Sequence, residues 1–74
     1  MYKKLSEIKI GSKAIIRSLE GIDIKLMEMG CIPGEIVKIE NIAPFKDPIS
    51  ITVAGYQLSL RIEEAEKIIV EEIF

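Results

Sequence analysis

The chain has 74 residues with a formal net charge of -2, one cysteine, and neither histidine nor tryptophan. This length predicts a single domain over residues 1–74, with a small core that sixteen isoleucines fill most readily as strands. The lack of histidine argues against an enzyme, and the negative net charge argues against nucleic acid as a partner. The chain has a single thiol and no predicted signal peptide or membrane span. These features indicate a cytoplasmic protein without direct membrane insertion.

A helical turn and a first strand open the sequence. Residues 6–11 end on Gly11, a pattern typical of a helical turn that leads into a strand and covers one end of a barrel. Residues 13–19 predict that strand, but the adjacent Ile15 and Ile16 point to opposite faces and leave its buried face undetermined.

A helix of about two turns is predicted over residues 24–29, after the first strand. Asp23 is placed to cap its first turn, and Gly30 is placed to end it in the left-handed conformation. Three apolar residues at spacings of four and three form one stripe: Ile22, Leu26 and Met29. Because so short a helix is unstable alone, this stripe has to pack against another part of the chain.

Pro33 and Gly34 occupy the two central positions of a predicted type II turn, in which the glycine supplies the positive φ. A strand follows over residues 35–43, with Val37 and Ile39 on one face. Its alternation is imperfect, which is expected of a strand that bends at a barrel corner.

The clearest pattern is a hairpin, with strands over residues 49–53 and 56–60 joined by a two-residue link that contains Gly55. Alternation assigns six residues to the core: Ile49, Ile51, Val53, Tyr56, Leu58 and Leu60. Residues 63–66 predict a single helical turn, and residues 68–70 predict a closing strand. The elements together indicate a mostly β fold class, a small five-stranded SH3-like barrel with a short helix inserted after the first strand and short helical turns.

The two ends of the chain differ in charge. Up to Arg17 there are five basic residues and one glutamate, whereas from Arg61 onward there are two basic residues and five glutamates. The ends are expected either to attract each other or to form two separate surface patches.

Four segments, in this order and at this chain length, carry a resemblance to a known family. They are Leu5-Ser6-Glu7, Met29-Gly30-Cys31-Ile32-Pro33-Gly34, Ala43-Pro44-Phe45-Lys46-Asp47-Pro48, and Gly55-Tyr56-Gln57-Leu58-Ser59-Leu60-Arg61 with Glu63-Glu64-Ala65. Over nearly its whole length the sequence resembles the FeoA family, small SH3-like cytosolic proteins of bacterial ferrous iron uptake. The resemblance implies an accessory or regulatory protein, without activity of its own, that binds the cytosolic side of the FeoB-type membrane GTPase transporter.

An alternative function is a small metal-binding (Fe or Cu) sensor or chaperone domain. Met27, Met29 and Cys31 carry soft sulfur ligands that suit Cu(I). Residues two apart on a helix lie about 200° around its axis, however, so core packing is the favoured interpretation of this trio. The glutamates after Arg61 are open to three interpretations, namely a solvated acidic face, a docking surface for a basic partner, or a weak Fe(II) site. No metal ligand, catalytic residue or cofactor is assigned.

Surplus apolar residues indicate a partner surface. Ile24 and Met27 lie off the main stripe of the predicted helix, which leaves apolar side chains for a partner or for a second copy of the chain in a weak homo-oligomer. Phe45 lies in a loop held by proline at both ends, and is either tucked over the barrel or offered to a partner. The predicted partner-binding residues are Ile24, Leu26, Met27, Met29 and Phe45.

Overall fold

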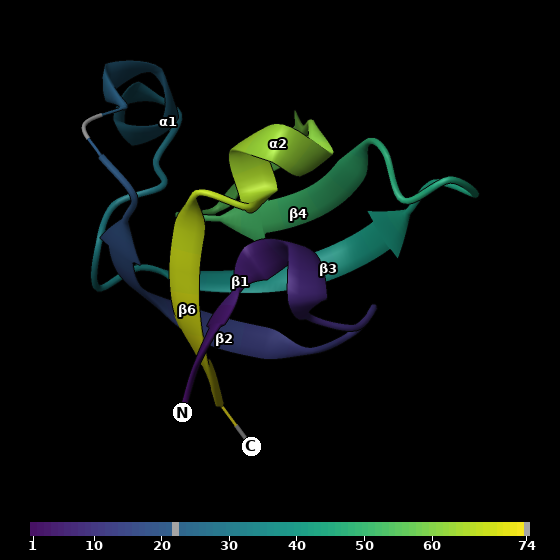
Figure 1. The fold of residues 1–74 in the computed structure, drawn as a ribbon, viewed down its shortest axis with the longest axis horizontal. Helices are drawn as coiled ribbons and strands as arrows, with labels where there is room; N and C mark the ends of the chain where they lie inside the picture. The colour runs from purple at the N-terminus through teal and green to yellow at the C-terminus, as the bar shows by residue number, and fades with distance from the viewer. Residues whose placement is uncertain (22, 74) are drawn as a thin grey trace.

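The computed structural model describes residues 1–21 and 23–73, and this part of the chain contains six short strands, two short α-helices and one 3-10 turn (Figure 1). In chain order the elements are β1 (Tyr2–Lys4), η1 (Leu5–Glu7), β2 (Lys13–Leu19), α1 (Ile24–Glu28), β3 (Ile36–Ile42), β4 (Ile49–Val53), β5 (Tyr56–Leu60), α2 (Ile62–Ala65) and β6 (Ile68–Ile73). The strands form one antiparallel sheet in the order β1-β6-β2-β3-β4-β5. The predicted mostly β fold class is confirmed.

Most strand boundaries follow the sequence closely, but β6 runs to Ile73, three residues beyond the predicted 68–70, and β1 is not predicted at all. Strands β2, β4 and β5 begin and end at the predicted residues, and β3 is one residue shorter than predicted at each end. Strand β1 is missed because Tyr2-Lys3-Lys4 has no alternation of apolar residues that would predict a strand. It forms through backbone pairing with residues 69–71 of β6. The prediction of five strands is therefore one strand short.

Alternate residues of the strands build a single core. Ile49, Ile51 and Val53 of β4 are buried, and so are Val37 and Ile39 of β3, as the alternation predicts. The predicted bend of β3 follows Ile39, where the register between β3 and β4 shifts. The core is therefore lined by the central strands and closed by side chains from the turns and helices.

One core assignment in the hairpin is wrong. Tyr56 is 68% exposed, and Leu58 is only half-buried. Both side chains remain at least partly exposed to solvent because Tyr56 directly follows the turn and because β5 is an edge strand of the sheet. The core does not extend over this end of β5, so both side chains lie where another molecule can reach them.

Two turns have the geometry that their residues predict. Gly34 has a φ of 99°, and the Glu35 N–H donates to the Ile32 carbonyl over 3.1 Å, as in a type II turn. In the hairpin, Ala54 and Gly55 have φ values of 51° and 83°, which is typical of a type I′ turn. This turn matches the twist of the two strands, which pair without a shift in register.

Opposite charges meet where β1 and β2 flank β6. The Lys3 Nζ lies 2.7 Å from the Glu72 Oε1, and the Arg17 Nη2 lies 2.8 Å from the Glu71 Oε1. The two ends of the chain therefore attract each other, which is the first of the two arrangements expected from the charge distribution. Because the pairs lie at the surface, each contributes at most about 1 kcal/mol to stability.

Candidate functional site

Helix α1 is held in place at its start. The Asp23 Oδ1 accepts a hydrogen bond from the Leu26 N–H over 3.1 Å, which confirms the predicted cap. Its other carboxylate oxygen lies 3.5 Å from the Lys67 Nζ, and the Lys25 Nζ lies 3.4 Å from a carboxylate oxygen of Glu64 in α2. Capping and ion pairs together fix a helix that is too short to be stable by itself.

The apolar residues of α1 divide between the core and the surface. Leu26 is fully buried, and Met29 is half-buried against the core. Ile24 and Met27 are 63% and 43% exposed. Ile22, the remaining member of the predicted stripe, lies outside the described residues. Of the predicted contact residues on this helix, Leu26 packs inward, and Ile24, Met27 and part of Met29 face outward.

A groove of about 370 Å³ runs between the end of α1 and the edge strand β5. It is lined by Glu28, Met29, Gly30, Tyr56, Gln57 and Leu58, and is called here the α1–β5 groove. Met29, Tyr56 and Leu58 supply apolar surface, while Glu28 places a negative charge beside it. Such a groove is suited to an apolar segment that also carries a basic residue.

The sequence predicts Met29 in this groove, but it does not predict Tyr56 or Leu58 as contact residues. Both belong to the hairpin alternation, which assigns them to the core. The signal that distinguishes them is their place on the strand after the turn, combined with the edge position of β5.

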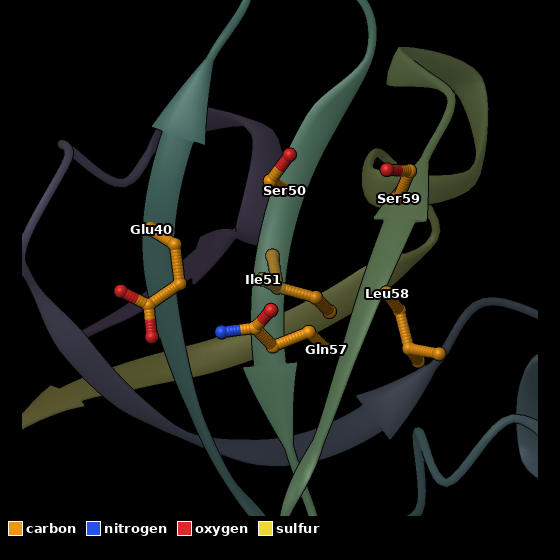
Figure 2. Close-up of a pocket in the computed structure, with 6 residues that line it drawn as sticks. All are labelled: Glu40, Ser50, Ile51, Gln57, Leu58 and Ser59. Carbon is orange, nitrogen blue, oxygen red and sulfur yellow. The ribbon is translucent and has the colours of Figure 1, made fainter.

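A second hollow, of about 310 Å³, lies on the other face of β5. Figure 2 shows its lining, with Glu40, Ser50, Gln57 and Ser59 displayed over three neighbouring strands and Leu58 pointing away from β4. The Thr52 Oγ1 donates to the Glu40 Oε2 over 2.6 Å at this face. This outer hollow is polar, in contrast to the α1–β5 groove.

Phe45 lies in a tightly hydrogen-bonded loop. The Lys46 N–H donates to the Ala43 carbonyl over 2.7 Å, and the Asp47 Oδ1 accepts from the Ile62 N–H at the start of α2 over 3.2 Å. Phe45 itself is 93% exposed, so of the two predicted arrangements the structure has the one in which the ring is offered outward. Figure 1 shows this loop, between β3 and β4, at the opposite end of the molecule from α1. The structure therefore does not bring Phe45 together with the α1 residues.

Cys31 is fully buried behind α1, as the sequence predicts for a small apolar side chain. Burial, with a smaller effect from the carboxylates of Glu64 and Asp23, raises the pKa of its thiol from 9.0 to about 11.

We expect the Cys31 thiol of the folded protein to react with iodoacetamide at pH 8 on the order of a hundredfold more slowly than in urea-unfolded protein. The raised pKa lowers the thiolate fraction by about that factor, and burial of the sulfur slows the reaction further. Mass spectrometry of timed samples measures both rates. Rapid labelling of the folded protein would show that α1 opens readily, contrary to the packing described above.

The α1 cap predicts a pH dependence. The hydrogen bond from the Leu26 N–H, together with the nearby Lys67 ammonium, holds the pKa of Asp23 below its ordinary value of 3.8. A carboxyl whose pKa is lower in the folded than in the unfolded protein stabilises the fold above the unfolded value and loses that effect as pH falls through the folded value.

We therefore expect Asp23→Ala to destabilise the protein at pH 7, and expect its difference from the natural protein to shrink as the pH falls below about 4. Urea denaturation at pH 7 and at pH 3 measures the difference. Asp23→Ser is the matched control, since it keeps a cap that does not titrate, and a pH-independent difference for Asp23→Ala would contradict the assignment.

Residues 1–21 and 23–73 contain neither a metal-binding cluster nor a membrane-spanning helix. These residues hold no group of three or more Cys, Asp or Glu side chains arranged to bind a metal ion. Their longest helix, α1, has five residues, and none of their helices has the length and hydropathy to cross a membrane.

The six-stranded antiparallel sheet with its short helices defines a small, mostly β domain of the SH3-like kind. The family model described as the FeoA domain matches residues 3–72, and the chain belongs to the FeoA family. This family consists of proteins associated with Fe2+ transport. The family resemblance seen in the sequence is confirmed.

Three similar proteins illustrate the relationship. The Fe(2+) transport protein A/Fe(2+) transporter FeoB fusion protein of Porphyromonas gingivalis is 37% identical over an alignment of 73 residues, which covers 95% of this chain. The chain spans only 9% of the length of that relative. A FeoA-like protein from Clostridium acetobutylicum, solved by NMR, is 37% identical with a TM-score of 0.92, covering 99% of this chain and 88% of the other. The zinc complex of Stenotrophomonas maltophilia FeoA, described as an SH3 domain protein, is 26% identical with a TM-score of 0.82, covering 93% and 89%.

Proposed function

We propose that this protein is a cytosolic accessory or regulatory protein of bacterial ferrous iron uptake that binds a FeoB-type membrane GTPase transporter and has no enzymatic activity of its own. The observation that carries the proposal is the fusion of a 37% identical domain to FeoB in one relative. A domain joined to a transporter in one organism is expected to contact the same kind of transporter when it is made as a separate chain. The rest of the proposal concerns the surface that makes this contact.

We place the main contact at the α1–β5 groove and the exposed residues of α1 beside it. Met29, Tyr56 and Leu58 give the groove apolar surface, and Ile24 and Met27 extend that surface along the helix. Partly exposed methionine and tyrosine side chains are enriched in protein interfaces, where they supply contact area in the centre of the patch. Leu26 supports this surface from below, since it anchors α1 in the core.

The experiment is a titration of the isotope-labelled protein with the purified cytosolic domain of the FeoB-type transporter from the same organism, followed by amide NMR. We expect shifts concentrated on residues 24–30 and 56–58, with a Kd below about 1 mM. Unchanged spectra up to that concentration would refute the proposal for this domain of the transporter.

Phe45 remains a predicted contact at a second, separate surface. Its loop, between β3 and β4, lies at the opposite end of the molecule from α1, so one flat partner surface is not expected to cover both Phe45 and the groove. In the same titration, shifts at residues 44–47 in addition to those at the groove would indicate that the partner reaches both ends.

A further inference from the structure

The two edges of the sheet differ in how they are protected. Strands β1 and β5 are the edge strands, and in the described part of the chain β5 pairs only with β4. Natural edge strands are usually shielded by charges, proline or a bulge, because their free backbone groups otherwise pair with another chain. β1 carries Lys3 and Lys4, whereas β5 consists of five uncharged residues, contains no proline and pairs with β4 without a shift. Edge β5 therefore lacks a protecting charge, proline or bulge, and only the end of α1 lies beside it across the α1–β5 groove.

The register identifies which backbone groups are free. Val53 and Tyr56 face each other across the two-residue turn, and such residues form a hydrogen-bonded pair. Hydrogen-bonded and non-hydrogen-bonded pairs alternate along an antiparallel ladder. The N–H and C=O groups of Tyr56 and Leu58 therefore face β4, and those of Gln57 and Ser59 face the free edge. The outward-facing backbone groups of Gln57 and Ser59 are two residues apart, which is the interval at which a neighbouring strand forms its hydrogen bonds.

The α1–β5 groove leaves room for the apolar side chains of such a strand. On one face lies the apolar α1–β5 groove, and on the other lies the polar outer hollow with Glu40, Gln57 and Ser59 (Figure 2). Successive side chains of a strand point to opposite faces. A segment of alternating apolar and polar residues would place its apolar side chains against Met29 and Leu58, and its polar ones beside Gln57 and Ser59 on the solvent-facing side of the sheet.

We propose that β5 is a recognition edge, at which an extended segment of the transporter is added as a further strand of the sheet. The segment alternates apolar and polar residues and carries a basic residue opposite Glu28, the charged residue of the groove. This inference rests on the proposed function, because it names the form in which the partner binds the same groove. It requires main-chain hydrogen bonds, which a helix or a globular surface in the groove would not make.

The test is amide hydrogen exchange of the labelled protein, free and bound to the cytosolic domain of the FeoB-type transporter from the same organism. In the free protein we expect the amides of Gln57 and Ser59 to exchange fast and those of Tyr56 and Leu58 to exchange slowly. On binding, Gln57 and Ser59 are expected to slow by at least tenfold. Binding with groove shifts but no protection at Gln57 and Ser59 would overturn strand addition and leave docking intact, whereas no binding at all would overturn both.

A pair of variants at one position provides a second test. Gln57→Pro removes an N–H that faces the free edge and leaves the hydrogen bonds to β4 in place, whereas Gln57→Ala removes only the side chain. We expect Gln57→Pro to weaken binding on the order of tenfold relative to Gln57→Ala. Equal affinities of two folded variants would overturn strand addition, and if Gln57→Pro does not fold, the exchange experiment on the natural protein decides.

Discussion

Leu26→Ala is expected to lower the free energy of unfolding by about 2–5 kcal/mol. Leu26 is fully buried and is the residue that ties α1 to the core, so its truncation leaves a cavity and frees the helix. Urea denaturation followed by circular dichroism measures the loss. For a domain of this size such a loss is a large fraction of the total stability.

Ile24→Ala is the matched control for this prediction. It removes a β-branched apolar side chain from the same helix, but Ile24 is 63% exposed, so the expected change is within about 0.5 kcal/mol. If both variants lost the same stability, α1 would pack through a different face from the one described. The pair therefore tests the orientation of the helix as well as its contribution.

Tyr56→Ala is expected to weaken binding to the cytosolic domain of the transporter by about 2 kcal/mol, roughly thirtyfold in Kd. Its ring lines the α1–β5 groove and is 68% exposed, so the truncation removes contact area while the core remains intact. Isothermal titration calorimetry measures the affinity, and the unfolding midpoint of the variant shows whether the fold is preserved.

The control for Tyr56→Ala is Tyr2→Ala. Tyr2 is 63% exposed and also lies on an edge strand, but on β1, which is the other edge of the sheet. Its replacement is expected to leave the affinity unchanged. An equal loss for both tyrosines would place the contact elsewhere or distribute it over the molecule, and an unchanged affinity for Tyr56→Ala would remove the groove from the interface.

Local signals account for the parts of the fold that are predictable from sequence. The hairpin follows from strict alternation on both sides of a link that contains Gly55, and the helix cap follows from Asp23 at the right distance before Leu26. In both cases the residues that determine the geometry are close together in the chain. The type II turn at Pro33-Gly34 is predictable for the same reason.

Features formed by distant segments are not predictable in this way. Strand β1 depends on pairing with β6 at the far end of the chain, and its residues alone carry no strand pattern. The α1–β5 groove depends on where Met29 comes to lie beside Tyr56, and alternation cannot tell an inward residue of a central strand from one at a sheet edge. The sequence therefore locates one wall of the candidate site, on α1, and leaves the other wall among the predicted core residues.

The pairing of β1 with β6 has a consequence for how this domain is joined to other proteins. Because the first and last strands are neighbours, the start of β1 and the end of β6 lie on the same side of the molecule, away from α1 (Figure 1). A covalent tether at either end leaves the groove accessible, and a short flexible tether gives a local concentration of about 1 mM. A contact with a Kd on the order of 10 µM would then be saturated in a fused protein. A separate chain with the same groove would have to reach that occupancy through its own abundance or a tighter fit.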